Sequence, residues 1–426
     1  MMFKNIIDEL KLRNLIFQIS DEKKIVKEIK SSNLRSVYCG FDSTADSLHL
    51  GHLIPLLVLK RFQNFGFIPI IVIGGATSLV GDPSFKRKER VLNTVNDIKN
   101  WNTKISLQIS SFLNKNSKSN HAIILNNYDW FKKMEIIYFL REIGKHYSIN
   151  KMISRDSVKE RIDRIGHGIS FTEFSYSLLQ SYDFYILHKK YKVSLQIGGS
   201  DQWGNIASGI HLIKRMSGKQ VFGLTVPLFV NSSGEKMGKS QGKPIWLDST
   251  KTTPYLFYQF WINIEDKDVY SFFRWFTFYS YKNIEKMEFE NSLKDDFCSN
   301  DRIKLAKTIT KLVHGELAMR SAVRITECLF FGSIEKLQIS DFEQLEKDGL
   351  FSVRIKGNIA LKKALVISKL CSSQTQAKQM IFSNAISINM KKVLNENHII
   401  TNDEKLFNRF TLLQKGKKNF SLLCWE

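Results

Sequence analysis

The sequence predicts the α/β fold class: a doubly wound parallel sheet, followed by an α-helical part and a small α+β part. Three observations predict it. Short apolar runs alternate with helical segments in the first half of the chain, and two of the runs end in paired glycines. The pattern then becomes helical and rich in aromatic residues, and the C-terminal stretch 356–426 is strongly basic. Alternating strands and helices are typical of a sheet with helices on both faces.

The first strand, helix and second strand follow each other closely. Residues 37–41 form a short apolar run that ends at a turn, and residues 50–65 have the spacing of an amphipathic helix. Residues 67–73 are rich in β-branched side chains and end at Gly74 and Gly75. This order predicts two strands joined by a crossover helix.

Two further strands are expected at residues 122–125 and 193–197, with helical segments between them. The second of these runs is closed by Gly198 and Gly199. In sheets of this kind, ligands bind outside the carboxyl ends of the strands. The chemistry is therefore expected at the turns where these strands end.

The rest of the chain is expected to form two smaller parts. Residues 253–342 show helical patterning, and Pro254 stands where a helix can begin. A linker is expected near residues 343–357. Residues 356–426 carry 12 Lys and Arg side chains against 4 Asp and Glu side chains. That charge density favours a separate basic module.

Composition excludes several classes of protein. Hydrophobic residues make up 43% and charged residues 24% of the 426 residues, as in soluble globular proteins. The apolar run at 53–59 is too short to cross a membrane, which takes about 20 residues. Asp8 and Glu9 interrupt the start before an apolar leader can form. Five scattered cysteines without C-x-x-C spacing argue against a disulfide framework or a cysteine zinc site. We expect a reduced, soluble, cytoplasmic protein with no membrane partner.

The net charge of +22 has two explanations. A basic balance of this size is typical of a protein whose partner is a polyanion, most often a nucleic acid. The alternative is mutational drift, because Lys, Asn and Ile are abundant and have AT-rich codons. The concentration of basic residues near the C-terminus favours nucleic acid.

The sequence H-L-G-H, from His49 to His52, follows the first strand. Its two imidazoles are three residues apart at a helix start and so share one face. Gly51 leaves room for a planar ligand, and a helix N-terminus attracts phosphate. These features predict a nucleoside triphosphate site. A zinc pair is the alternative, although suitable further ligands are missing nearby.

A second candidate is Lys236-Met237-Gly238-Lys239-Ser240, which follows Asn231-Ser232-Ser233-Gly234. Two lysines on a loop flanked by glycine and serine can move in and neutralise phosphates as their charge develops. Taken alone, this motif would indicate only a solvent-exposed loop that carries two lysines. Its occurrence with H-L-G-H in one α/β chain favours the phosphate function.

The pairing of these two motifs resembles the class I aminoacyl-tRNA synthetases. Longer motifs narrow the resemblance to the bacterial tyrosyl-tRNA synthetases, from about residue 34 to the C-terminus. They are Gly74-Gly75-Ala76-Thr77, Gly81-Asp82-Pro83-Ser84, Asn126-Asn127-Tyr128-Asp129-Trp130, the stretches 171–176 and 196–205, Gln180, Asp183 and Tyr258-Gln259-Phe260-Trp261.

The resemblance implies a reaction in two steps. Tyrosine and ATP give tyrosyl-adenylate and pyrophosphate, and the tyrosyl group then passes to the 3'-terminal adenosine of tRNA(Tyr). The substrate carboxylate is the nucleophile, so catalysis depends on positioning and charge stabilisation rather than on a general base. ATP is a substrate that brings Mg²⁺ held mainly by phosphate and water. No prosthetic group and no protein-held metal are expected.

The resemblance also implies three groups of site residues. At the reacting phosphates we expect Thr44, His49, His52, Lys86, Arg90, Lys236 and Lys239. For tyrosine we expect Tyr38 and Asp183 at the phenol hydroxyl, Asp82, Tyr176 and Gln180 at the ammonium group, and Gln202 near the carboxylate. For ATP we expect Asp42, His49, Gly51 on the purine side, His52, Asp201 at the ribose, Lys236 and Lys239. Without the motifs, Tyr38 and Tyr176 would be ordinary core tyrosines and Asp183 a helix cap.

The implied domains are a Rossmann-like catalytic domain at 1–250 and a helical anticodon-side domain at 251–345. A linker at 346–358 would lead to an RNA-binding domain at 359–426 that resembles ribosomal small-subunit protein four. Bacterial relatives are homodimers, so a homodimer is expected.

The sequence departs from the family pattern at a few positions. Gln374 and Gln379 stand where related RNA modules usually carry basic residues, and Met390 replaces a turn glycine. These changes leave open how strongly the module binds tRNA. Ser43 replaces a common proline, which loosens the turn before H-L-G-H slightly. None of these changes removes an implied catalytic group.

Three other functions would each account for only part of the sequence pattern. A tryptophanyl-tRNA synthetase would need neither Asp183 nor the C-terminal module. A non-catalytic RNA-binding descendant should have lost His49, His52 or Lys239. A nucleotidyltransferase with H-x-G-H would explain neither the tyrosine pocket nor the RNA module.

Overall fold

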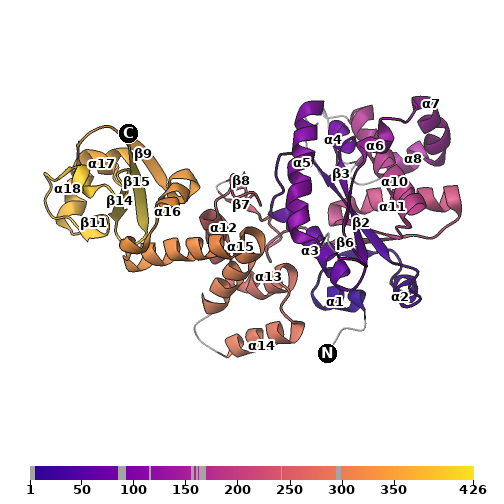
Figure 1. Ribbon diagram of the computed structural model, residues 1–426, viewed down its shortest axis with the longest axis horizontal. Coiled ribbons are helices and arrows are strands. Elements are labelled where there is room, and N and C mark those ends of the chain that lie inside the picture. The colour runs from indigo at the N-terminus through magenta and orange to yellow at the C-terminus, as the bar shows by residue number, and fades with distance from the viewer. Residues whose placement is uncertain are drawn as a thin grey trace. The chain divides into compact units, whose positions relative to one another are not determined.

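The structure is a computed structural model that describes residues 5–84, 93–114, 117–154, 158–159, 162, 169–240, 242–293 and 299–426 (Figure 1). The chain divides into two compact units. The first comprises Met1–Trp246 and Tyr270–Leu293, and the second comprises Leu247–Val269 and Lys294–Glu426. Among the described residues, no helix is long and apolar enough to cross a membrane.

The first unit is built on a six-stranded sheet with the order β1-β6-β5-β2-β3-β4. The strands are β1 (Gln18–Ile19), β2 (Ser36–Asp42), β3 (Ile68–Gly74), β4 (Ile123–Asn126), β5 (Leu195–Gly199) and β6 (Phe222–Val226). All neighbours pair in parallel except β1, which is antiparallel to β6. The predicted α/β class with a parallel sheet is therefore confirmed. β1 and β6 were not predicted from the sequence.

The strand order reverses beside β2. Its residues pair with β3 on one side, where Asp42 lies opposite Gly74, and with β5 on the other, where Tyr38 lies opposite Gln196. From β2 the chain continues outward to β3 and β4, and later returns to build β5 and β6 on the opposite side. Such a reversal leaves a crevice at the carboxyl ends of the two central strands.

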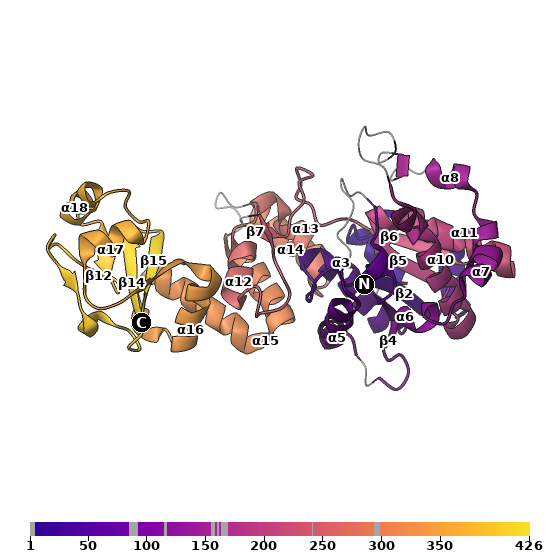
Figure 2. The same cartoon turned by 90° about the horizontal axis from the view of Figure 1, so that it is seen from above.

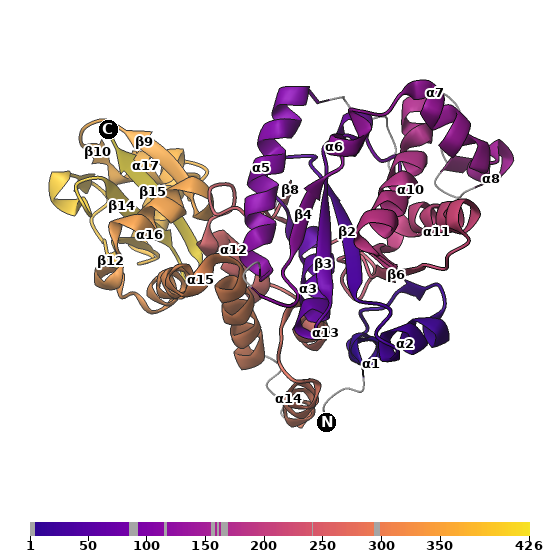
Figure 3. The ribbon, with the colours of Figure 1, turned by 45° about the vertical axis from the view of Figure 1, so that its right-hand side comes forward.

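Helices cover both faces of this sheet (Figure 3). Helices α3 (Leu50–Asn64) and α5 (Val95–Phe112) lie on one face, and α10 (Phe171–Tyr191) and α11 (Trp203–Ser217) on the other. The remaining elements of the unit are α1 (Ile6–Leu12), α2 (Glu22–Lys30), α4 (Thr77–Val80), α6 (Tyr128–Phe131), α7 (Ile136–Tyr138), η1 (Phe139–Ile143), η2 (Gly144–His146), α8 (Ile149–Ile153), η3 (Ser200–Gln202), β7 (Lys239–Ser240), β8 (Lys243–Pro244) and α14 (Tyr281–Ser292). Helix α13 (Val269–Phe276) belongs to this unit from Tyr270 onward.

The start and end of α10 follow from local chemistry. The side chain of Ser170 accepts a hydrogen bond from the Glu173 backbone amide, which caps the first turn. Lys192 ends the helix in the left-handed conformation. Between these ends, Phe184 and Leu187 are fully buried against Tyr38 of β2. This packing places the side chains of α10 that face the crevice.

The second unit begins with α12 (Pro254–Ile262), which packs along α15 (Ser299–Phe331). Helix α15 is broken at Gly315, whose φ of 86° and ψ of 172° are not helical. The remaining helices are η4 (Asp266–Asp268), η5 (Ile334–Lys336), α16 (Ile339–Gln344), η6 (Leu345–Gly349), α17 (Leu361–Ile367), α18 (Gln374–Phe382) and η7 (Asn402–Glu404). The N-terminus of α12 is held by Asp348, which accepts from the backbone amide of Thr253 over 2.8 Å.

A five-stranded sheet with the order β12-β11-β14-β15-β9 completes this unit. Its strands are β9 (Phe351–Ile355), β11 (Ile386–Ile388), β12 (Lys391–Lys392), β14 (Phe410–Lys415) and β15 (Asn419–Trp425), and β10 (Ile359–Ala360) pairs separately with β13 (Ile399–Ile400). β9 lies inside the range 346–358 that was expected to be a linker, and it pairs in parallel with β15.

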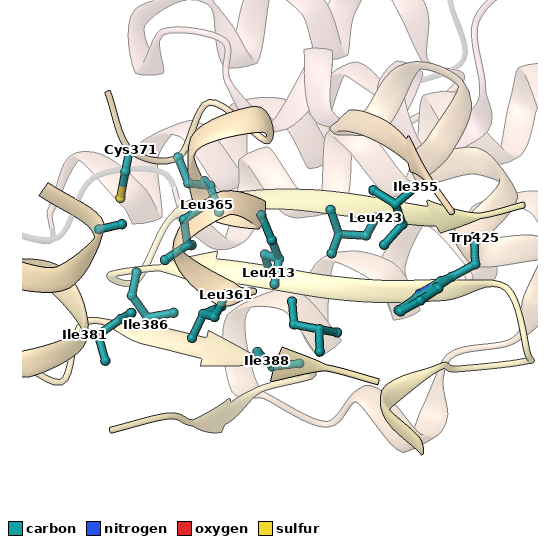
Figure 4. Packing of buried hydrophobic residues seen from close by; sticks show 14 residues of the cluster. Ile355, Leu361, Leu365, Cys371, Ile381, Ile386, Ile388, Leu413, Leu423 and Trp425 are labelled. Carbon is teal, nitrogen blue, oxygen red and sulfur yellow. The ribbon is translucent and has the colours of Figure 1, made fainter. Parts of the chain in front are cut away.

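The two faces of this sheet bury different cores, because side chains alternate along a strand. Leu413 faces a core that includes Leu365 of α17 and Ile381 of α18 (Figure 4). Its neighbour Leu412 packs instead with Phe342 of α16. Helices α17 and α18 therefore cover one face, and α16 lies against the other (Figure 2).

The turn between β11 and β12 explains why the family pattern has glycine where this chain has Met390. Asn389 and Met390 both have positive φ angles, of 48° and 67°. Two-residue hairpins of this kind favour Asn followed by Gly, because glycine adopts positive φ without strain. Met390 accepts this conformation, and its side chain packs against the core around Phe342.

Candidate active site

A pocket of about 320 Å³ opens at the carboxyl ends of the central strands. Twelve of the residues predicted from the sequence line it: Tyr38, Asp42, Thr44, His49, Gly51, His52, Asp82, Tyr176, Gln180, Asp183, Asp201 and Gln202. They come from strand ends, helix starts and α10, which the doubly wound topology brings to one edge of the sheet.

The two histidines of H-L-G-H have defined hydrogen bonds. Nδ1 of His49 accepts from the backbone amide of Gly51 over 3.1 Å, and Nδ1 of His52 accepts from the backbone amide of His49 over 3.2 Å. Their rings stack with centroids 3.9 Å apart. Burial, together with the neighbouring His49, lowers the pKa of His52 well below its usual value. Because each Nδ1 is an acceptor, the proton of each neutral ring is on Nε2. The start of α3 thus has two imidazole N–H donors suited to an anion.

A buried polar network begins at Asp42, the last residue of β2. Its two carboxylate oxygens accept from different partners, Oδ1 from Thr77 Oγ1 and Oδ2 from Tyr176 Oη, each over 2.7 Å. Burial raises the pKa of Tyr176, and the charge of Asp42 raises it further. Tyr176 therefore stays protonated and is fixed as a donor to Asp42.

The network continues to Asp183 through Asn127. The Nδ2 group of Asn127 donates to Thr77 Oγ1 over 3.0 Å and to Asp183 Oδ2 over 3.1 Å. Trp130 Nε1 donates to the other oxygen of Asp183 over 2.8 Å. Burial raises the pKa of Asp183 to about 8, although both of these hydrogen bonds oppose the rise. The carboxyl group is thus held in one orientation in the pocket wall.

Tyr38 is the buried hydroxyl that this network does not reach. Its side chain is 1% exposed, and within the described part of the chain its Oη has no hydrogen-bond partner. Burial raises its pKa, and the charge of Asp183 adds to the effect. A buried hydroxyl without a partner costs roughly 1–3 kcal/mol. Since Tyr38 and Asp183 line the same pocket, a polar group of a ligand is the natural partner for both.

The wall formed by the end of β5 is shaped for close approach to the backbone. A Cβ at Gly199 would lie 2.5 Å from Asp201 Oδ1, and one at Gly198 would lie 2.9 Å from Gln202 Cβ. Gln202 Nε2 donates to Asp82 Oδ2 over 2.8 Å. Burial raises the pKa of Asp201, and the charge of Asp82 acts in the same direction. These glycines allow the side chains of Asp201 and Gln202 to pack directly against the backbone at the end of β5.

Two predicted residues, Lys236 and Lys239, are not among the described residues that line the pocket. Lys236 and Lys239 are exposed on the loop that follows β6. Lys86 and Arg90 lie outside the described residues.

Sequence reasoning assigned no role to three residues that hold the site together. Thr77 and Asn127 connect the carboxylates of Asp42 and Asp183, and Trp130 donates to Asp183. The sequence did offer a signal for two of them, because Asn127 directly follows β4 and Thr77 follows β3 after Gly75 and Ala76. Cys39 and Phe229 also line the pocket without having been predicted.

Two family models match the chain. The model described as tRNA synthetases class I (W and Y) matches residues 30–330, and the model described as Tyrosine--tRNA ligase SYY-like C-terminal domain matches residues 341–423.

Curated relatives are similar along their full length. A Tyrosine--tRNA ligase of Buchnera aphidicola subsp. Schizaphis graminum is 56% identical over 422 residues, which is 99% of this chain and 100% of the relative. A Tyrosine--tRNA ligase of Escherichia coli O139:H28 is 50% identical over 426 residues and covers 100% of both chains.

Among solved structures, a C-terminally truncated mitochondrial tyrosyl-tRNA synthetase from Aspergillus nidulans has a TM-score of 0.68 and 28% identity. The match covers 77% of this chain and 95% of that one. A tyrosyl-tRNA synthetase from Archaeoglobus fulgidus, with a TM-score of 0.55 and 16% identity, shares the fold.

Proposed function

The chain belongs to the class I tRNA synthetases of the tryptophan and tyrosine family, and from this premise we propose how its pocket performs the reaction of a tyrosine–tRNA ligase. In the first step, a carboxylate oxygen of L-tyrosine attacks the α-phosphorus of ATP. The bond from that phosphorus to the bridging oxygen breaks, which gives tyrosyl-adenylate and pyrophosphate. In the second step, a ribose hydroxyl of the 3'-terminal adenosine of tRNA(Tyr) attacks the carbonyl carbon, and AMP leaves.

The observation that carries this proposal is the pair formed by Tyr38 and Asp183. Both are buried in the wall of one pocket, and the hydroxyl of Tyr38 has no hydrogen-bond partner within the described residues. The phenol hydroxyl of tyrosine can donate to one of these groups and accept from the other. Phenylalanine would leave the buried hydroxyl of Tyr38 without a partner and would offer no hydroxyl to Asp183. The pair therefore favours tyrosine over an amino acid of the same shape without a hydroxyl.

The α-ammonium group of tyrosine is assigned to Tyr176, Asp82 and Gln180. Tyr176 is fixed by Asp42, and Asp82 is held by Gln202 and by the backbone amide of Ser84. The Oε1 of Gln180 is buried without a hydrogen-bond partner in the described part of the chain, so it is an acceptor for an ammonium group. Gln202 is then adjacent to the carboxylate that reacts.

The phosphates of ATP are assigned to the start of α3. The Nε2–H groups of His49 and His52 donate to oxygens whose charge grows during the reaction, and Thr44 lines the same pocket. Gly51 would contact the purine, Asp42 the nucleotide and Asp201 the ribose. Lys236, Lys239, Lys86 and Arg90 would contact the departing pyrophosphate.

Mg²⁺ is proposed as part of the substrate MgATP. Within the described residues, no group of three or more His, Cys, Asp or Glu side chains is placed to hold one metal ion. Phosphate oxygens and water would then supply the ligands, as is usual for Mg²⁺.

The C-terminal module is assigned to tRNA(Tyr). Lys417 and Lys418 are exposed on the turn between β14 and β15, where basic side chains reach phosphate. Lys415 has a different function, because its Nζ donates to the carbonyl of Leu370 over 2.8 Å and fixes the end of β14. Gln374 and Gln379 of α18 are exposed on the module and contribute no charge.

A homodimer is proposed from an exposed apolar surface on the segments α7, η1 and α8. Ile136, Ile137 and Leu140 are 66%, 69% and 50% exposed, and Ile149 of α8 is 64% exposed. Apolar side chains gathered in this way mark an interface more often than a solvated surface. Ile137→Lys should yield monomers in analytical ultracentrifugation, whereas Lys132→Glu should not. We place the enzyme in the cytoplasm, with the other components of translation.

Amino-acid-dependent ATP–pyrophosphate exchange tests the proposal. Tyrosine, phenylalanine and tryptophan are compared without tRNA. Exchange with tyrosine alone supports the assignment of Tyr38 and Asp183. Exchange with tryptophan would instead indicate the other specificity within this family, and no exchange from folded protein would contradict the pocket assignment.

A further inference from the structure

We define the lysine loop as residues 230–245. The middle of this loop packs against Phe229, which directly precedes it in the sequence. The backbone amide of Met237 donates to the carbonyl of Phe229 over 2.9 Å. Gly238 has a φ of 87°, and a Cβ placed there would lie 3.3 Å from the ring of Phe229. Met237 and Gly238 separate Lys236 from Lys239. The contact point of the loop is thus between the two lysines assigned to pyrophosphate.

Phe229 is itself held by two aromatic side chains of α13. Its ring is 5.4 Å from that of Phe272 and 5.2 Å from that of Phe276, with interplanar angles of 62° and 77°. Edge-to-face pairs of this kind contribute about 0.5–1.5 kcal/mol beyond their buried area. Phe229 is 5% exposed, whereas Phe272 and Phe276 are almost completely buried. We call Phe229, Phe272 and Phe276 the aromatic seat.

The segment that carries Phe272 and Phe276 is fixed by buried arginines. Nη2 of Arg13 donates to the carbonyl of Tyr279 over 2.7 Å, and Nη2 of Arg61 donates to the carbonyl of Thr277. Both arginines also donate to Oε1 of Glu9, over 2.7 Å and 2.9 Å. The last carbonyls near a helix end lack helical partners, and cations stabilise them. Since Arg61 lies in the last turn of α3, the seat is fixed to the helix that begins with H-L-G-H.

We propose that the aromatic seat positions Lys236 and Lys239 for adenylate formation, so that Phe272 and Phe276 are positioning residues that act through the loop. This inference rests on the proposed function. Both lysines are exposed and outside the pocket lining, so their placement depends on the contacts of the loop backbone. A misplacement of about 1 Å can lower a rate about 100-fold. A looser seat should therefore slow the chemical step without weakening tyrosine binding.

The first test compares Phe276→Leu with Phe273→Leu. Both residues are 0% exposed and lie on α13, but Phe273 packs against Tyr270 and Tyr279 rather than in the seat. Single-turnover adenylate formation, the equilibrium constant for tyrosine binding and urea unfolding are measured for each variant. We expect Phe276→Leu to slow adenylate formation about tenfold or more and to raise the KM for ATP. Tyrosine binding should not change, and Phe273→Leu should keep the rate despite a similar loss of stability.

The second test asks whether Phe276 acts through the loop. Phe276→Leu is combined with Lys239→Ala, and the double-mutant cycle is completed for the rate of adenylate formation. If the aromatic seat acts through the loop, Phe276→Leu should lower the rate of adenylate formation much less when Lys239 is already replaced by Ala. Equal effects in both backgrounds, or equal rate losses in the two phenylalanine variants, would overturn the inference.

Two further measurements keep the outcome interpretable. If Phe276→Leu does not fold, Phe276→Met retains more of the buried volume and should give an intermediate rate with unchanged tyrosine binding. A rate equal to that of the unmodified chain would contradict the proposed positioning role of the aromatic seat. Failure of the proposed function is separate, because it would show as missing tyrosine-dependent exchange in the unmodified chain itself.

Discussion

The backbone amide of Leu50 donates a hydrogen bond to the carbonyl oxygen of Ile245 over 3.0 Å. This bond joins the start of α3, which carries H-L-G-H, to the last residue of the lysine loop. Ile245 donates in turn to the carbonyl of Gly238 within the loop over 2.8 Å. Two motifs that lie far apart in the sequence are therefore connected through the backbone. The side chains that we propose to bind phosphate can then act on one substrate.

Removing the donor of His52 should slow the first step. His52→Ala is expected to lower adenylate formation about 100-fold or more, because its Nε2–H donates where charge develops. Pyrophosphate exchange gives the rate. His121→Ala, an exposed histidine outside the pocket lining, is the control. An unchanged exchange rate in His52→Ala would refute its assignment.

Removing the carboxyl group of Asp183 should damage the use of tyrosine. Asp183→Ala is expected to lower kcat/KM for tyrosine about 10-fold to 100-fold, since a buried hydroxyl left without its hydrogen-bond partner costs roughly 1–3 kcal/mol. The value for phenylalanine should fall much less. Asp129→Ala, which removes an exposed carboxylate on α6, should leave both values unchanged. Equal losses for both amino acids would indicate a structural defect instead.

Glu9 should be essential to stability. It is the carboxylate partner of both Arg13 and Arg61, and all three side chains are buried. Glu9→Gln should lower the free energy of unfolding by about 3–5 kcal/mol, because it leaves buried positive charge uncompensated. Glu22→Gln breaks an ion pair with Lys11 that is exposed and should cost about 1 kcal/mol or less. Urea unfolding distinguishes the two, and similar losses would contradict the expectation.

His314 should make the second unit sensitive to acid. Burial lowers its pKa to about 4, although the charge of Asp248 partly opposes this, and its ring packs edge-on against Phe257. Between about pH 4 and pH 6.5, the unfolded chain binds a proton at this position and the folded chain does not. The free energy of unfolding therefore decreases as the pH falls through this window.

The size of this effect can be measured with His314→Leu. From pH 7 to pH 5 the unmodified chain should lose about 2 kcal/mol more than the variant. Urea unfolding at the two pH values gives the comparison. An identical pH dependence in both proteins would show that His314 is already protonated or exposed when folded.

The turn between β14 and β15 should contribute to tRNA binding. Replacing Lys417 and Lys418 together by Gln is expected to weaken tRNA binding and to reduce the salt dependence of log K by about 0.7–0.9 for each lost phosphate contact. Pyrophosphate exchange without tRNA should not change. Lys23→Gln on α2, which removes one exposed lysine of the first unit, is the control. An unchanged salt slope in the double variant would exclude this turn from the interface.

A deletion of the whole C-terminal module would be a poorer experiment. Phe410 and Leu412 pack against Phe342 and Ile325, which lie outside the module's own sequence range. Removing the module would expose this core, so a loss of activity could come from unfolding. Point changes on its surface avoid that difficulty.

The sequence by itself determined the fold class, the edge of the sheet at which the pocket lies and twelve of the residues that line it. Periodicity located the strands β2 to β5, and the glycine pairs marked the strand ends at which ligands bind. Tyr38 and Asp183 were singled out only through the resemblance to a known family, whereas the H-L-G-H histidines form a contiguous motif of their own. These are local properties of the chain, and local patterns can be read without coordinates.

Only the tertiary structure decided which groups hold one another. Thr77, Asn127 and Trp130 become one hydrogen-bonded path because parallel strands bring separate strand ends to one edge. Phe229 meets Phe272 and Phe276, which come from a later and separate segment of the sequence. The protonation of Asp183 and His52 likewise depends on burial by distant segments. Burial and long-range contacts depend on how the whole chain packs, so no local pattern specifies them.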